Sequence, residues 1–248
     1  MIFLSTIIGG ILMTRPKIIL HMSESINGNI TGPYNKAAGA NLGKAYEYAD
    51  EKINSNAMIL GRKTIEENFT SKEMPSLPEN PKSYSRNEDF VANTDLDHYV
   101  ISIDPSGKAA WEQNYIEFRD RPKMHVIEVL SEKVSDAYLE YLRNLNISYV
   151  FGGPDKKLDL KSVVSKLNQL FNLEKLTLSG GGGVNWSFFE QGLVDEISII
   201  IAPVVDDHFN RPHLFDNNEK DKSDVIQNYK IDHVEQLDGN IVWLYYKI

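Results

Sequence analysis

The residues best suited to chemistry in this chain form two short segments that contain glycine. Gly180–Gly183 is a run of four glycines between a strand-like and a helix-like stretch. Bare backbone N–H groups at the start of a helix bind anions such as a diphosphate. A turn that needs positive φ would explain one or two of these glycines, but less easily four. We therefore expect an anion site here, with a flexible turn as the alternative.

The second segment is Gly61-Arg62-Lys63-Thr64, directly after the apolar run Ala57–Leu60. Its glycine lets the backbone approach a ligand, and its three polar side chains supply donors for a phosphate. A plain strand-to-helix turn with solvated cations remains equally open. A third loop, Asp104–Lys108, follows the strand-like run Tyr99–Ile103. Its Ser106 could meet a ribose or a phosphate, or simply belong to a Pro-Ser-Gly turn.

A fourth segment, Ser25–Gly32, follows the first strand-like run. It could close over a ligand, or it could be only an Asn-Gly turn. His21 precedes it, and a lone histidine in a strand is more often hydrogen-bonded in a core than catalytic.

These segments need a scaffold, and the hydrophobic pattern predicts one of alternating strands and helices. We expect strands at Lys17–Met22, Ala57–Leu60, Tyr99–Ile103, Met124–Val129, Ser148–Phe151, Lys175–Leu178 and Glu196–Ala202. We expect helices at Ala40–Asn54, after Gly61, and at Ser135–Leu145, Leu160–Phe171 and Val184–Gln191. Such alternation indicates βαβ units and a mostly parallel sheet. Leu237-Asp238-Gly239, between Tyr229–Gln236 and Asn240–Lys247, predicts a closing antiparallel hairpin.

Two stretches do not fit this alternation. Phe69–Asp97 contains three prolines among polar residues and predicts a long loop, which is usually functional or mobile. Met1–Met13 is apolar, but it is too short to span a bilayer and has no basic flank of a signal peptide. We expect residues 1–13 to be an extension and residues 14–248 to be a single domain without a membrane anchor.

The composition excludes several kinds of site. The 248 residues include no cysteine, which rules out disulfides, thiolate nucleophiles and cysteine zinc sites. This fits a reducing, cytoplasmic location. The six histidines show no ligand spacing, so we expect no metal site. The net charge of -9 without a basic stripe argues against nucleic-acid binding.

Taken in order, these segments resemble a known family. The chain has a first strand leading into S-x-N-G-x-I, a strand ending in G-R-K-T, and a late strand entering a glycine-rich turn. G-L-V-D-E-I and an apolar strand ending in Ala-Pro follow. This is similar to the dihydrofolate-reductase-like superfamily, and more narrowly to the stand-alone pyrimidine reductases of riboflavin biosynthesis, over about Arg15 to Ile248. It implies an α/β fold with a mostly parallel sheet flanked by helices and a C-terminal antiparallel hairpin.

The resemblance also implies an activity. The family binds NADPH and delivers hydride to an imine-like sugar carbon of a ribosylaminopyrimidine 5′-phosphate, and related reductases commonly form homodimers. The residues implied in cofactor binding are Gly61, Arg62, Thr64, Gly180, Gly181, Gly182, Gly183, Val184 and Asn185, to which the third loop adds Ser106. Ser25, Asn27 and Gly28 would lie beside the nicotinamide and the substrate.

Three residues depart from the family pattern. Asn27 replaces the usual Asp, Ser179 replaces a Glu, and His21 replaces a Lys. We expect these three to line one pocket, with cofactor binding kept and turnover of the ribosylaminopyrimidine phosphate slow. Two other functions stay open: a paralogue that reduces another imine, pteridine or carbonyl compound, and a nucleotide-binding protein without catalysis.

Overall fold

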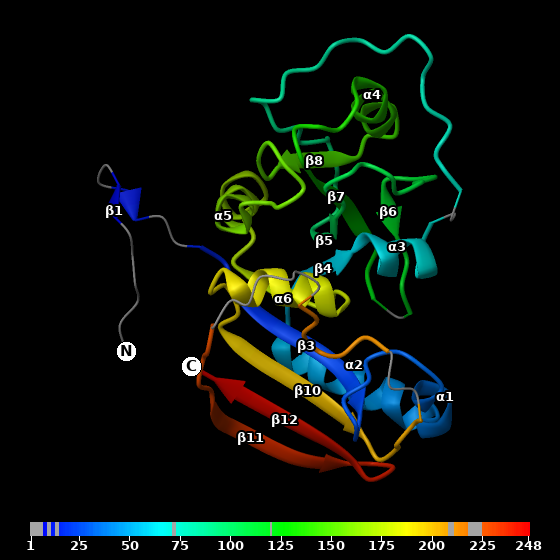
Figure 1. The fold of residues 1–248 in the computed structure, drawn as a ribbon, viewed down its shortest axis with the longest axis vertical. Coiled ribbons are helices and arrows are strands. Elements are labelled where there is room, and N and C mark those ends of the chain that lie inside the picture. Colours follow the sequence, from blue (N-terminus) through cyan, green and yellow to red (C-terminus); the bar gives the residue numbers. More distant parts are fainter. Residues whose placement is uncertain are drawn as a thin grey trace.

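The centre of a ten-stranded sheet is parallel (Figure 1). In sheet order its strands are β10 (Glu196–Ala202), β3 (Lys17–Ser25), β9 (Lys175–Leu178), β4 (Ala57–Gly61), β5 (His98–Ile103), β7 (Met124–Leu130) and β8 (Ser148–Phe151). At one side β12 (Ile241–Lys247) and β11 (Lys230–Leu237) continue the sheet antiparallel, and the short β6 (Tyr115–Ile116) pairs antiparallel with β7. This computed structural model describes residues 7–8, 11–12, 15–70, 73–119, 121–207, 211–217 and 225–248. The predicted fold class is confirmed.

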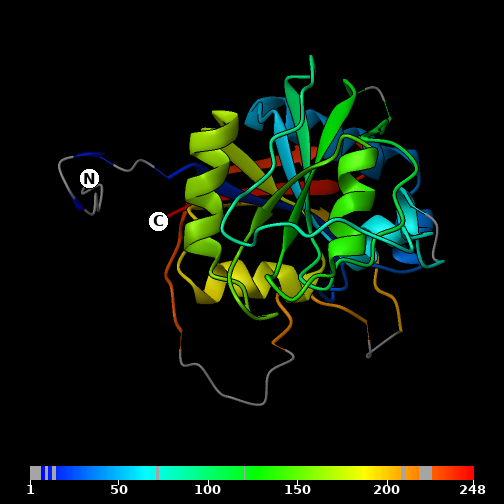
Figure 2. The same ribbon diagram turned by 90° about the horizontal axis from the view of Figure 1, so that it is seen from above.

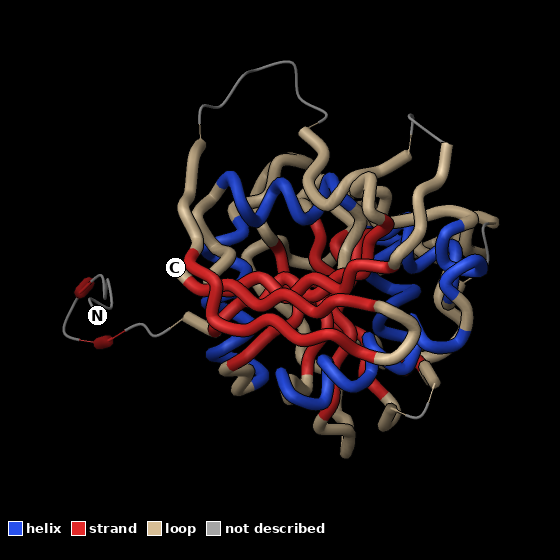
Figure 3. The backbone as a smooth tube through the Cα atoms, turned by 90° about the horizontal axis from the view of Figure 1, so that it is seen from below, coloured by secondary structure: helices blue, strands red, loops and turns tan. Residues whose placement is uncertain are grey.

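Helices cover both faces of this sheet (Figures 2 and 3). Successive side chains of a strand point to opposite faces of the sheet, so each strand contributes to the hydrophobic core on either face. In β4, Ile59 joins an apolar cluster with α5 (Leu160–Phe171) and α6 (Gly182–Glu190). Met58 and Leu60 point to the opposite face, where α3 (Arg62–Asn68) and α4 (Asp136–Asn144) pack. On that face α2 (Ala40–Ile53) covers β3, β10 and β12, with the short α1 (Tyr34–Ala38) beside it.

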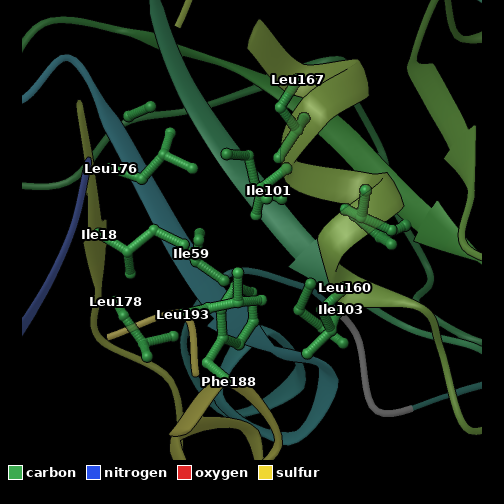
Figure 4. Close-up of a cluster of buried hydrophobic side chains, with 14 of the residues drawn as sticks. Ile18, Ile59, Ile101, Ile103, Leu160, Leu167, Leu176, Leu178, Phe188 and Leu193 are labelled. Carbon is green, nitrogen blue, oxygen red and sulfur yellow. The ribbon is translucent and has the colours of Figure 1, made fainter. Parts of the chain in front are cut away.

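Figure 4 shows the largest core, between the sheet and helices α5 and α6. Ile18 and Ile101 from the strands meet Leu167 of α5 and Phe188 of α6, and all four are fully buried. Each such side chain contributes about 1.5–3 kcal/mol of burial free energy. Helix α5 has the predicted bounds because Asp159 caps its first turn by accepting the N–H of Ser162. This core fixes the ends of the parallel strands, where loops can form a site.

The structure differs from the sequence prediction mainly in short polar segments. Strand β3 continues past Met22 to Ser25, because β10 runs beside it up to the pair Ala202–Ser25. Helix α1 and strand β6 were not expected, since five and two residues are too few for a hydrophobic period. Helix α6 begins at Gly182 rather than Val184, so the last two glycines belong to its first turn.

The long loop predicted at Phe69–Asp97 contains no helix or strand in its described residues, and Figure 1 draws it as a teal trace around α4. Phe90 and Tyr149 of β8 exchange two backbone hydrogen bonds of 2.9 Å each. Arg86 donates to Asp136 at 2.7 Å and to the carbonyl of Val134 at 2.7 Å. This half of the loop therefore covers the edge of β8 and protects it from pairing with another chain.

Within the amino-terminal extension the structure describes only β1 (Ile7–Ile8) and β2 (Ile11–Leu12), which form a separate two-stranded sheet. The other residues of Met1–Met13 lie outside the described residues, so the division into extension and domain stays a prediction. In the described part of the chain, no helix has the length and apolar character needed to cross a membrane.

Candidate active site

A cleft of about 590 Å³ opens on the face of the sheet that carries α2 and α3. Met58 and Leu60 of β4 contribute to its lining, and Ser179, which follows β9, lies beside them. Ligands of parallel sheets bind at the carboxyl ends of the strands. The cleft extends to this end of the strands, where it is lined by Ser23, Thr64, Ser179, Gly180 and Gly181.

The glycine-rich turn contributes to the cleft through Gly180 and Gly181. A Cβ on Gly181 would meet nothing closer than Thr64 Oγ1 at 4.0 Å, so this glycine faces open space. Gly181 is also the N-cap of α6, and as a glycine it has no side chain to cap that helix. The first N–H groups of a helix have no partner within it. On the Gly181 side the start of α6 is therefore open toward the cleft, whereas the carboxylate of Asp216 lies against Gly182.

The other glycines serve packing. A Cβ on Gly61 would lie 2.8 Å from Val184 Cγ2, and one on Gly180 would lie 3.0 Å from Val184 Cβ. Both glycines thus make room for Val184. A Cβ on Gly182 would collide with the carbonyl oxygen of His213, in a segment that crosses the start of α6.

Asn185 belongs to the same packed region. It is fully buried, and its amide donates to the carbonyl of Leu214 at 2.8 Å. Gly183 follows Gly182 in the first turn of α6, where its carbonyl accepts the hydroxyl of Ser187 at 2.9 Å. These residues hold the turn in place and do not line the cleft.

At the end of β4, Thr64 lines the cleft but Arg62 does not. The guanidinium of Arg62 contacts Glu66 one helical turn away, and its Nε lies 3.6 Å from Asp104 Oδ1. Asp104 is fully buried and accepts the backbone N–H groups of Ser106 and Ala109 at 3.3 and 2.9 Å. Arg62 and Ser106 are therefore brought together through Asp104, beside the cleft rather than in it.

The loop after β3 is held by the loop after β10. Ser25 donates to Asn27 Oδ1 at 3.0 Å, and the Asn27 amide donates to the carbonyl of Asp206 at 3.0 Å. Gly28 has a φ of 82°, and its carbonyl lies 3.0 Å from the Nδ1 atom of His213. Ser25, Asn27 and Gly28 lie near the carboxyl end of β3 but do not line the cleft.

His21 is enclosed behind the cleft. Its Nδ1 lies 3.0 Å from Ser198 Oγ, its Nε2 lies 3.3 Å from the carbonyl of Tyr46, and its ring is fully buried. Burial lowers the pKa of His21 to about 3, so the ring stays neutral. Of the three departures from the family pattern, only Ser179 lines the cleft. The expected common pocket of His21, Asn27 and Ser179 is not formed.

A model of the RibD C-terminal domain family matches residues 16–243. The chain belongs to this family. The 2,5-diamino-6-ribosylamino-4(3H)-pyrimidinone 5′-phosphate reductase of Aquifex aeolicus (strain VF5) is 24% identical over 208 residues, 82% of this chain and 83% of that protein. The resemblance seen in the sequence is thereby confirmed, and a reductase relative supports an oxidoreductase class for this RibD-type domain.

Solved structures share the fold of this RibD-type domain. A pyrimidine reductase-like protein from Corynebacterium diphtheriae has a TM-score of 0.63 at 18% identity, over 95% of this chain and 92% of that chain. RibD from Acinetobacter baumannii has a TM-score of 0.61 at 15% identity over 94% of this chain. The chain spans 58% of that RibD protein. At these identities the likeness concerns the fold.

Tyr46 and Arg119 are among the residues that line the cleft of this RibD-type domain without being predicted as site residues from the sequence. The helical spacing of Tyr46 within Ala40–Asn54 predicts only an apolar helix face, yet this residue lines the cleft. Arg119 follows β6 in a segment that has no hydrophobic periodicity, and it lines the cleft. Its Nη1 forms an ion pair with Glu47 at 3.0 Å. Its guanidinium lies 4.9 Å from the Phe118 ring, also in the cleft. Only the tertiary fold brings these residues to β4 and β9.

Proposed function

We propose that this protein is an NADPH-dependent reductase that transfers hydride to a ribosylaminopyrimidine 5′-phosphate in riboflavin biosynthesis. The observation that carries the proposal is the cleft at the carboxyl ends of β9 and β4, where the open glycine Gly181 and Ser179 lie together. Membership in the RibD C-terminal domain family and the activity named for the Aquifex relative support it.

The residues at the cleft fit a dinucleotide. The start of α6 beside Gly181 suits a diphosphate, because N–H groups and a positive helix end face an anion there. Thr64 Oγ1 lies opposite Gly181 and supplies a hydroxyl for the same phosphates. Arg62 and Lys63 directly precede Thr64 at the end of β4, and we assign them the extra phosphate that distinguishes NADPH from NADH.

When bound, the reduced nicotinamide supplies the hydride, and the protein's task is to align donor and acceptor carbons. Ser179 leads directly into Gly180, so its side chain lies at the junction between the cofactor turn and the rest of the cleft. Met58, Leu60 and Phe69 give this region an apolar wall. Such a wall limits water around the reacting carbon and strengthens hydrogen bonds to the substrate.

Arg119 suits the substrate phosphate. It is the one cationic side chain among the described residues that line the cleft. Its guanidinium lies at the side of α2, where Nη1 would be 3.9 Å from a Cβ on Gly43. A guanidinium binds phosphate oxygens with two parallel hydrogen bonds. The rings of Tyr46 and Phe118 flank Arg119 and could pack against the pyrimidine.

The proposal is tested by titrating the protein with NADPH, followed by fluorescence, and then measuring turnover of the phosphorylated and the dephosphorylated pyrimidine. Arg119→Ala should raise KM for the phosphorylated substrate at least tenfold, about 1.4 kcal/mol, with little effect on the dephosphorylated one. Failure of the native protein to bind NADPH would remove the proposal. An equal effect of Arg119→Ala on both substrates would remove only the phosphate assignment.

A further inference from the structure

Tyr46 lines the cleft, and its hydroxyl forms a small hydrogen-bond network with Ser179, which also lines the cleft. The two hydroxyl oxygens are 3.1 Å apart, and the carbonyl of His21 accepts from Tyr46 at 3.2 Å and from Ser179 at 3.0 Å. The ring of Tyr46 packs against the ring of His21 at an angle of 32°, with ring centroids 4.0 Å apart. Tyr46 is thus held rigidly, with its hydroxyl beside the residue that leads into the cofactor turn.

This network leaves a proton available. Ser179 alone can satisfy the carbonyl of His21, since one donor is enough for that acceptor. The hydroxyl of Tyr46 is then able to donate to Ser179 or to a group bound in the cleft. Burial raises the pKa of Tyr46, and this keeps its hydroxyl protonated at neutral pH. The charged groups around it are Arg121, Asp50 and Arg119.

The proposed reduction needs a proton donor. Hydride addition to a carbon–nitrogen double bond moves an electron pair to nitrogen, and this nitrogen must be protonated. Among the described residues of the cleft, the side chains with an ionisable proton are Tyr46, Glu67 and Arg119. Glu67 is exposed on α3, and an arginine keeps its proton in proteins. His21, which replaces the family's lysine, is neutral and enclosed.

We propose that Tyr46 is the catalytic acid of this reductase and gives its hydroxyl proton to the substrate nitrogen. This inference rests on the function proposed above. The reduced nicotinamide, when bound, would supply the hydride for the new C–H bond, and the π pair of the C=N bond would move to nitrogen. The O–H bond of Tyr46 breaks as the N–H bond forms, and the phenolate then takes a proton from water. Ser179 positions the hydroxyl and does not donate.

The test compares Tyr46→Phe with Tyr48→Phe, the same change two residues along α2. Tyr48 packs edge-on against Trp243, and its hydroxyl lies 3.4 Å from Glu235, outside the cleft. In single-turnover experiments we expect Tyr46→Phe to slow reduction about 10²–10⁴-fold, the usual contribution of a general acid. We expect NADPH and substrate affinities measured by titration to stay unchanged, and Tyr48→Phe to match the native protein.

Two further measurements separate proton donation from a structural role. The reduction step of the native protein should show a solvent deuterium isotope effect. The size of this isotope effect should change in Tyr46→Phe. Ser179→Ala should slow the step less than tenfold, and this variant decides the question if Tyr46→Phe does not fold. Native-like rates for Tyr46→Phe, or a larger loss for Ser179→Ala, would overturn the role of Tyr46 alone. A native protein without turnover of this substrate would overturn the proposed function and this inference with it.

Discussion

Asn27 and Asp206 exchange two hydrogen bonds across neighbouring loops. The Asn27 amide donates to the Asp206 carbonyl at 3.0 Å, and the Asp206 N–H donates to Asn27 Oδ1 at 3.2 Å. A carboxylate could accept the second bond but could not donate the first. The amide at this position, where the family usually has Asp, therefore has a structural reason: it joins the loop after β3 to the loop after β10.

Asn27→Asp should destabilise the protein rather than improve it. The change removes one donor and places a charge against the Asp206 carbonyl, so we expect the free energy of unfolding to fall by about 1 kcal/mol. Chemical denaturation measures this, with Asn228→Asp at an exposed position as the control for the change of charge. Higher stability together with faster turnover would show instead that this site lacks a carboxylate.

Gly181 and Gly182 are adjacent glycines with different roles. Gly181→Val should fold normally, because its side chain enters open space, but it should weaken NADPH binding at least tenfold, about 1.4 kcal/mol. Gly182→Ala should lower stability instead, since its Cβ meets the His213 carbonyl. Thermal unfolding and fluorescence titration on both variants give the comparison. Unchanged affinity in folded Gly181→Val would remove the diphosphate assignment.

The preference for NADPH over NADH should depend on the pairing of Arg62 with Glu66. Glu66 contacts the guanidinium that we assign to the extra phosphate, so Glu66→Gln should tighten NADPH binding more than NADH binding. Arg62→Ala should erode the preference, because a charge-assisted bond to phosphate is worth about 1.5–3 kcal/mol. Glu79→Gln, at an exposed position in the long loop, controls for net charge. Equal affinities of the native protein for both cofactors would count against this docking mode.

We expect the protein to form a homodimer through its C-terminal hairpin. Strand β11 is the outer strand of the sheet, and its Ile231 and Val234 are 55% and 57% exposed. An open edge with apolar side chains favours pairing with a second copy. Light scattering at micromolar concentration should give twice the chain mass, and Val234→Asp should lower it. A monomer mass for the native protein would contradict the prediction.

The sequence predicted the scaffold better than the site. Strands such as Ser148–Phe151 and Lys175–Leu178 have the predicted bounds, because short apolar runs between polar turns leave little choice. Thr64 and Gly181, which lie in the predicted phosphate loops, and Ser179, which the family resemblance singles out, all line the cleft, and their roles there stay predictions. The sequence pattern could not find Arg119, since a residue in an irregular loop reaches the cleft only through tertiary packing.

Tyr46 is a second residue whose place in the site could not be predicted from the sequence. An aromatic residue at helical spacing predicts a core contact, and its ring does pack against His21. The role of its hydroxyl depends on Ser179, which lies 133 residues further along the chain. Gly61 and Gly180, which the sequence predicts as cofactor contacts, also make room for Val184, and Gly180 lines the cleft as well. Whether a glycine makes room for packing depends on the position of the neighbouring side chain, which the sequence alone does not give.

The most direct test of the central proposal is to incubate the native protein with NADPH and 2,5-diamino-6-ribosylamino-4(3H)-pyrimidinone 5′-phosphate. The loss of nicotinamide absorbance and the mass of the product are followed together. We predict that NADPH is oxidised only when the pyrimidine is present, and that the product is heavier than the substrate by two hydrogens. Binding of NADPH without any such product, at substrate concentrations that saturate a known reductase of this family, would contradict the proposed function.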